Sequence, residues 1–193
     1  MDQVRTDRLG LLVDQFDRAR EQYEPRLAGL TDDEYLWEPV PGAWSLRRRG
    51  NAVSPKPLGT GEWLLDDAPE DPDPAPVTTI AWRLCHLQWS FEGRWEWTFG
   101  ARTRPTRDVE FSPHATEALD RFWVTAAQWR DDVNALEPGD LDTTGFGTFP
   151  NGWDPDVPFV AVLWWVNLEF VHHMAEIALL RDLWAHQVSP ARR

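Results

Sequence analysis

Cysteine is almost absent from this chain of 193 residues, which contains only Cys85. A single cysteine cannot form an internal disulfide framework, and it excludes a zinc site built from several thiolates. Any metal site must therefore be built from histidine and carboxylate side chains. We expect Cys85 itself to be a buried and unreactive thiol, because a free cysteine usually packs as a small apolar residue.

Long apolar runs are also missing. The longest one covers the eight residues 159–166, whereas a membrane-spanning helix needs about 20 apolar residues. The first ten residues, MDQVRTDRLG, contain charges but no apolar segment behind them, so we expect no signal peptide. These absences together predict a soluble cytoplasmic protein with no membrane partner.

Positive charge is scarce, and lysine occurs only as Lys56. The 19 basic residues are outnumbered by 32 acidic ones, which gives a formal net charge of −13. A protein with this charge is a poor candidate for binding a nucleic-acid backbone. The sequence also lacks a glycine-rich phosphate-binding loop. We therefore expect a small-molecule substrate and no nucleic-acid partner.

Four segments do carry the apolar spacing of a buried helix face. They cover about residues 9–30, 80–100, 112–136 and 156–186. The stretches 51–75 and 139–155 are rich in proline, glycine and aspartate and have no sustained periodicity, so they are expected to be long loops. No strand pattern is evident. The sequence predicts one all-α domain over residues 1–193, a four-helix bundle with long connections between its first and second and its third and fourth helices.

Local signals place several helix ends. Pro25 is expected to kink or end the first helix. Thr78 or Thr79 can cap the second helix, since a threonine hydroxyl accepts a hydrogen bond from a free backbone N–H of the first turn. Ser112, followed by proline, is the predicted cap of the third helix.

The fourth helical segment carries acidic and histidine side chains at helical spacing. Glu169 and His173 are four residues apart and project from the same face, with Glu176 three residues beyond His173. The second helical segment carries His86. If these helices face each other, His86, Glu169 and His173 converge. Two imidazoles and a carboxylate suit Zn²⁺, Ni²⁺, Fe²⁺ or Mn²⁺, with positions left for water or substrate.

A purely structural role for the same residues is also open. A helical Glu-x-x-x-His pattern is common by chance, and on an exposed face both side chains would simply be solvated. However, Glu169 lies in a strongly apolar helix, where an unpaired carboxylate would be costly to bury. His172 points about 100° away from His173, and it could contact a substrate or pack at an interface.

Tryptophan is unusually abundant, with 13 copies. Most of them lie in the helical segments, where we expect them to fill the core or an interface. Trp82 and Trp89 lie about one turn on either side of His86, which makes them candidate walls of a cavity around this histidine.

Residues 36–45 (LWEPVPGAWS), 78–87 (TTIAWRLCHL) and 169–176 (EFVHHMAE) resemble the DinB/YfiT-like superfamily of metalloenzymes. The resemblance implies an up-down-down-up four-helix bundle that is often dimeric, so a homodimer is an expected assembly. It also implies a divalent metal, usually zinc or nickel. A histidine of the second helix and two residues of the fourth helix would hold it.

One position departs from the common family pattern. Many members have histidine at both positions of the fourth helix, whereas this chain has Glu169 at the first of them. The related mycothiol-dependent maleylpyruvate isomerases use a His, Glu, His set, which corresponds here to His86, Glu169 and His173. The resemblance therefore implies these three residues as metal ligands.

The resemblance also implies chemistry with a low-molecular-weight thiol such as mycothiol or bacillithiol. Metal coordination favours the thiolate, which would attack an electrophilic carbon of a small substrate. Glu176 would accept a hydrogen bond from a ligand histidine or move a proton. Trp44 lies in the family loop that approaches the pocket. Arg47 could hold an anionic group of substrate or cofactor, although a solvated turn also explains it.

Two other classes of function fit the same residues. One is a non-catalytic stress-response bundle that binds a metal or ligand without turnover. The other is a metal-assisted hydrolase of a small amide or ester. No Ser-His-Asp arrangement or placed thiol indicates covalent hydrolysis.

Overall fold

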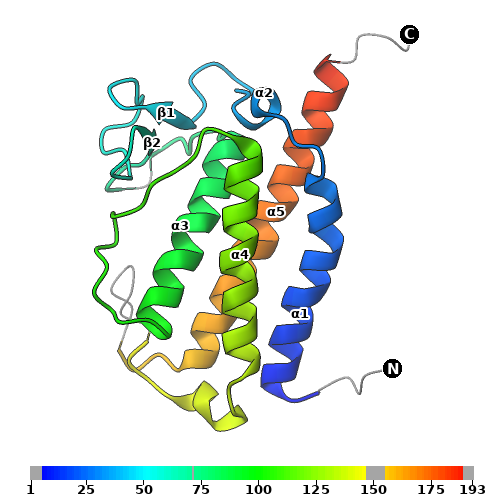
Figure 1. Cartoon of the computed structure of the whole chain (residues 1–193), viewed down its shortest axis with the longest axis vertical. Helices are drawn as coiled ribbons and strands as arrows, with labels where there is room; N and C mark the ends of the chain where they lie inside the picture. Colours follow the sequence, from blue (N-terminus) through cyan, green and yellow to red (C-terminus); the bar gives the residue numbers. More distant parts are fainter. Residues whose placement is uncertain (1–5, 71, 147–154, 189–193) are drawn as a thin grey trace.

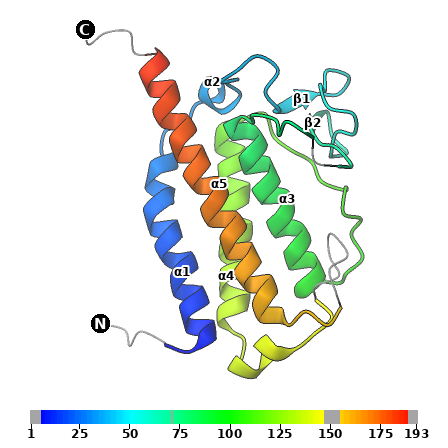
Figure 2. The same ribbon diagram turned by 180° about the vertical axis from the view of Figure 1, so that it is seen from behind.

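The computed structural model describes residues 6–70, 72–146 and 155–188. Its main elements are four long helices: α1 (Arg8–Tyr23), α3 (Ile80–Thr98), α4 (Ala115–Asn134) and α5 (Phe159–Val188). They lie alongside one another, with α1 and α5 running in one direction and α3 and α4 in the other (Figures 1 and 2). The fold is mostly helical, as the apolar periodicity predicted. Residues 147–154, part of the predicted loop 139–155, lie outside the described residues.

Shorter elements fill the connections. The 3₁₀ helix η1 (Glu24–Leu27) follows α1, so the first helix ends just before Pro25, as predicted. The short helix α2 (Asp32–Tyr35) comes next, and η2 (Pro138–Asp142) precedes α5.

A small sheet corrects the expectation that the chain has no strands. Strand β1 (Leu46–Arg48) pairs antiparallel with β2 (Trp63–Leu65), so that Leu46 lies opposite Leu65. Three residues are too short to produce a visible alternation of apolar and polar side chains, which is why the sequence did not reveal these strands. Part of the predicted loop 51–75 is therefore ordered against the end of the molecule where α3 begins (Figure 1).

Helix caps show both a success and a failure of local prediction. Thr79 caps α3, and its hydroxyl accepts from the Trp82 N–H. By contrast, α4 does not begin at Ser112. Its cap is His114, and the Ala115 N–H donates to the carboxylate of Asp32, which comes from α2. A partner distant in sequence therefore takes the capping role that was assigned to Ser112.

The core between the four long helices is aromatic. Phe170 of α5 lies 4.7 Å from Phe16, 6.1 Å from Phe91 and 6.1 Å from Phe122, measured between ring centroids. These four rings come from four different helices and are all buried. Burying them supplies much of the hydrophobic free energy that holds the helices together.

Tryptophan contributes less to this core than its abundance suggested. Among the described residues, Trp129 is the one tryptophan in the buried core, at 2% exposed. Most of the other helical tryptophans pack at the edge of the core, and Trp164 is 56% exposed. The expectation that the helical tryptophans fill the core or an interface therefore holds only in part: an indole is large, and most of these extend beyond the core.

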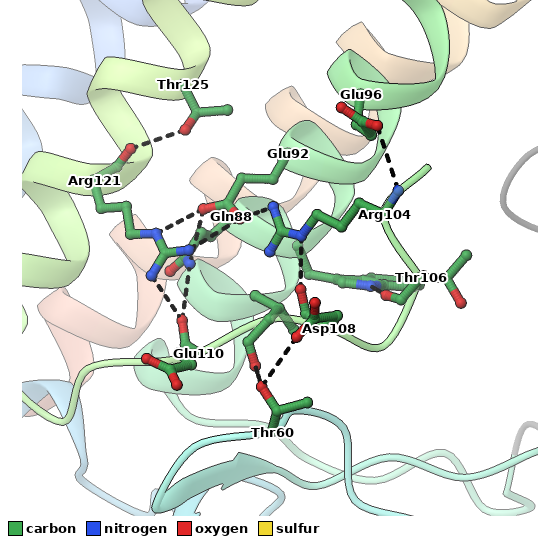
Figure 3. Close-up of polar contacts among 12 residues, drawn as sticks. Thr60, Gln88, Glu92, Glu96, Arg104, Thr106, Asp108, Glu110, Arg121 and Thr125 are labelled. Carbon is green, nitrogen blue, oxygen red and sulfur yellow. Dashed lines mark hydrogen bonds and ion pairs between the residues drawn. The ribbon is translucent and has the colours of Figure 1, made fainter. Parts of the chain in front are cut away.

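A polar network ties α3, α4 and the connection between them together (Figure 3). The carboxylate of Glu92 on α3 accepts from Arg104 of the connection and from Arg121 of α4. Trp89 donates its indole N–H to the backbone carbonyl of Thr106, and Thr60 pairs with Val109. The connection 99–114 thus links α3 to the loop that carries β1 and β2.

Within the described part of the chain, none of the helices has the length and hydropathy needed to cross a membrane.

We expect Glu92→Gln to lower the free energy of unfolding by about 1–2 kcal/mol, because Arg104 and Arg121 would lose their shared anion. The loss stays modest because these guanidinium side chains are 35% and 44% exposed, so water screens the ion pairs. Denaturant unfolding measures it. Glu21→Gln, at an exposed position, serves as the control and should change stability by less than about 0.5 kcal/mol. Equal effects of the two substitutions would contradict the role assigned to Glu92.

Candidate metal centre

His86 of α3 and two side chains of α5 meet where these helices pack together. Oε2 of Glu169 lies 3.3 Å from Nε2 of His86 and 3.3 Å from Nε2 of His173. One ligand atom from each of the three residues lies within 4.8 Å of the other two. The structure thus brings together the three residues that sequence spacing singled out.

These distances are long for hydrogen bonds and are compatible with three atoms that share one divalent metal ion. An N–H···O hydrogen bond is usually about 2.9 Å long, and both contacts to Oε2 of Glu169 are 3.3 Å. Ligand atoms placed about 2.0–2.1 Å from one tetrahedral ion lie about 3.3–3.4 Å apart. Two imidazole nitrogens and one carboxylate oxygen are also donors that zinc and related ions accept. The residues present therefore fit a divalent cation.

The protonation states of the cluster suit metal ligation. Burial acts to raise the pKa of Glu169, but hydrogen bonds with His173 and His86 outweigh it and hold the pKa well below its usual range. Burial lowers the pKa of His173 to about 4, so this imidazole is neutral at pH 7. An ionised carboxylate and a neutral imidazole are the forms that bind a metal.

Behind the cluster, Glu176 holds the outer side of the His173 ring. Its Oε2 lies 3.0 Å from Nδ1 of His173, as expected for an acceptor that orients a ligand histidine. The same carboxylate forms an ion pair with Arg83 of α3. Its other oxygen lies 3.2 Å from Nε2 of His172, an exposed residue. Sequence analysis did not single out Arg83, because an arginine in a helical segment gives no signal of which residue it faces.

Two tryptophans frame His86. The Trp82 indole stacks on the imidazole, with centroids 5.0 Å apart and ring planes 9° apart. Trp89 lies on the following turn, with its ring centroid 5.9 Å from that of His86. Their positions one turn before and after the histidine place an apolar wall on each side of the ring, which fixes its orientation.

A cavity of ≈ 520 Å³ lies beside the cluster. His86, His173 and His172 line one side of it, together with the aromatic side chains of Trp44, Trp82 and Trp89. Described residues of the loop between Leu65 and Thr78 line it as well. A space of this size next to the ligand atoms leaves room for a small molecule.

Asp66 organises the loop side of this cavity, and sequence analysis missed it. Its side chain is fully buried, and it accepts hydrogen bonds from the N–H groups of Ser45, Val53 and Ser54. Its backbone carbonyl accepts from the indole N–H of Trp82 at 2.7 Å. In the sequence, Asp66 begins an acidic run that is typical of a solvated loop, so only the fold reveals its burial.

Arg47 does not line the cavity. Its guanidinium donates to the carboxylates of Glu38 and Asp66 and to the backbone carbonyl of Ala43. These three partners occupy the Arg47 guanidinium, the group that the sequence suggested could hold an anionic part of a substrate. Arg47 instead anchors the turn after Trp44 to the loop that contains Asp66. The family-like loop 36–45 thus reaches the cavity through Trp44, whereas Arg47, which follows this loop, does not line the cavity.

Cys85 is buried, as expected. Burial raises the pKa of its thiol to about 12, and Sγ lies 3.2 Å from the Tyr35 hydroxyl. A neutral, buried thiol is neither a nucleophile nor a metal ligand at pH 7.

The sequence profile of the DinB superfamily matches residues 56–177 of this chain. The matched region is more than half of the chain and contains His86, Glu169 and His173. No curated protein and no solved structure gives a significant match.

The depressed pKa of His173 predicts a stability that depends on pH. In chelator-treated protein, unfolded His173 titrates near pH 6.5, whereas the folded residue stays neutral down to about pH 4. The unfolded state therefore binds more protons between these values, and acidification destabilises the fold. We expect the free energy of unfolding to fall by about 1–2 kcal/mol between pH 7 and pH 5, as measured by denaturant titration. His173→Gln should remove most of this loss.

His114→Gln is a suitable control for this experiment. A hydrogen bond with Asp32 raises the pKa of His114, so its contribution has the opposite sign: it stabilises at low pH and is lost as pH rises through the folded-state pKa. This variant should retain the loss on acidification. A His173→Gln protein with an unchanged pH dependence would contradict the assignment.

Proposed function

Because this chain belongs to the DinB superfamily, we propose that it is a divalent-metal-dependent enzyme that uses a low-molecular-weight thiol. It acts as an S-transferase or isomerase on a small electrophile. The observation that carries the proposal is the pair of 3.3 Å distances from one oxygen of Glu169 to the imidazoles of His86 and His173, beside a cavity of ≈ 520 Å³. Zn²⁺ suits the donor set best, and Ni²⁺, Fe²⁺ and Mn²⁺ also fit.

The side chains have distinct roles in this proposal. His86, Glu169 and His173 hold the ion, and the chemistry that a bound divalent ion supplies is a lowered thiol pKa, which makes thiolate available at neutral pH. Trp82 and Trp89 keep His86 in place and exclude water from one side of the cluster. Trp44 faces the same cavity, where it can pack against the apolar part of a substrate. Glu176 fixes the tautomer of His173 by accepting a hydrogen bond from its Nδ1–H.

Two reactions fit this proposal, a transfer of the thiol and an isomerisation that uses and returns the thiol. In transfer, the thiolate sulfur forms a bond to an electrophilic carbon, and the leaving group departs with the electron pair of the bond that breaks. In isomerisation, the sulfur adds to a carbon–carbon double bond, whose electron pair takes a proton. Rotation about the new single bond and loss of the same thiol and proton then give the isomer.

The cavity favours turnover over passive metal binding. Structural zinc sites are usually closed by four protein ligands, whereas catalytic sites keep a position open. Here three ligand side chains meet next to a cavity that is lined mainly by aromatic side chains and one loop.

We also propose that the four long helices form the four-helix bundle of the family, within a single domain. A homodimer stays a prediction.

Metal binding is the first test of this proposal. We expect the purified protein, treated with chelator and titrated with Zn²⁺, to bind close to one ion per chain. His86→Ala, Glu169→Gln and His173→Ala should each weaken binding by at least about 10-fold, because each removes one of three ligands. His186→Ala, at an exposed position far along α5, is the matched control and should bind normally. Unchanged metal content in the three ligand variants would overturn the site.

Thiol consumption tests the reaction. We expect the Zn²⁺-loaded protein to accelerate the loss of mycothiol or bacillithiol with a small electrophile by at least about 10-fold over the uncatalysed reaction. Chelator and His86→Ala should each abolish the acceleration. Normal metal binding without turnover of any thiol would favour the non-catalytic alternative. Chelator-sensitive cleavage of a small amide or ester without thiol would favour the hydrolase.

A further inference from the structure

Arg83 contacts the outer side of the metal-ligand cluster, at Glu176 and His173. It lies one turn before His86 on α3, and its side chain is only 16% exposed. Its Nη1 contacts Oε2 of Glu176 on α5 and lies 3.2 Å from Nδ1 of His173. Among the described residues, Glu176 is its ion-pair partner, so the cost of burying the guanidinium is offset mainly there.

Nδ1 of His173 cannot hydrogen-bond to both neighbours in one tautomer. Glu176 can only accept, and its Oε2 lies 3.0 Å from Nδ1. Arg83 can only donate, and its Nη1 lies 3.2 Å from the same atom. A protonated Nδ1 therefore pairs with Glu176 and leaves a lone pair on Nε2, which can then bind a metal instead of donating to Glu169. An unprotonated Nδ1 pairs with Arg83 and places a proton on Nε2, where a metal would have to bind.

Glu176 also has a competing partner on its own helix. Its Oε1 lies 3.2 Å from Nε2 of His172, an exposed residue one helical turn away. Without the positively charged Arg83 side chain on α3, the Glu176 carboxylate would be free to move toward His172 and solvent. The ion pair with Arg83 prevents this, because it holds Oε2 between the guanidinium and Nδ1 of His173.

We infer that Arg83 is a positioning residue for the metal site: it holds the Glu176 carboxylate against His173, so that the lone pair of Nε2 faces the metal position. Arg83 acts through Glu176 and does not touch the metal. This inference rests on the proposed function, since it concerns how the same site binds its ion. It adds to the site the positively charged side chain of Arg83, which reaches from α3 across to α5.

Zn²⁺ affinity tests this role directly. We expect Arg83→Gln and Arg83→Met to weaken Zn²⁺ binding by about 10–100-fold, the usual effect of losing a group that orients a ligand. Arg83→Lys should recover part of the loss, because it restores a positive charge near Glu176. Competition with a chromophoric chelator measures the affinities. Denaturant unfolding of the metal-free proteins establishes that each variant folds, and Arg83→Met covers the case in which Arg83→Gln does not fold.

A double-mutant cycle separates positioning from a general structural effect. If Arg83 acts through Glu176, then Glu176→Gln combined with Arg83→Gln should bind Zn²⁺ no more weakly than Glu176→Gln alone. Arg130→Gln is the matched control: Arg130 is also a partly buried arginine that pairs with a carboxylate on another helix, Asp17, and it should lose stability without losing Zn²⁺ affinity.

Two results would overturn the inference. One is an affinity of Arg83→Gln and Arg83→Met within twofold of the unsubstituted protein. The other is a double variant whose loss equals the product of the two single losses. Both results presuppose that the unsubstituted protein binds Zn²⁺. Failure of that protein to bind the ion would instead overturn the proposed function.

Discussion

Glu169 sets the main constraint on this structure, because it is a carboxylate on a largely apolar helix that packs inside the protein. Its side chain is only 20% exposed, and an ionised carboxylate is stable there only with partners of suitable chemistry. Two imidazoles supply them, one from its own helix and one from α3. The need to satisfy this carboxylate therefore couples the packing of α3 against α5 to the geometry of the candidate metal centre.

The loop side of the cavity follows the same physical rule. Asp66 is completely buried, and three backbone N–H groups and the Arg47 guanidinium donate to it. These donors belong to residues 45–54. Their hydrogen bonds to the Asp66 carboxylate therefore hold that segment in place near the start of α3. Its backbone carbonyl then fixes Trp82, which in turn stacks on His86. A buried charge in a loop thus determines where a wall of the cavity stands.

Several features of the fold and site could be predicted because their causes are local. Apolar periodicity marked the four long helices, and the threonine before Ile80 marked the start of α3. Helical geometry alone placed Glu169 and His173 on one face. The cap of α4 and the pairing of β1 with β2 depend on contacts between distant residues, so local patterns could not identify them. The contacts of Arg47 could not be predicted for the same reason: its partners Glu38 and Asp66 are brought to it by the fold.

The sequence by itself determined the helical class, the family and the residue types available to a metal, since these follow from periodicity, motif and the near absence of cysteine. Only the tertiary structure decided that His86 faces α5, that Asp66 is buried and that Arg83 reaches Glu176. The physical reason is that helix spacing fixes which side chains share a face of one helix. Packing between helices and the burial of loop charges fix which faces meet.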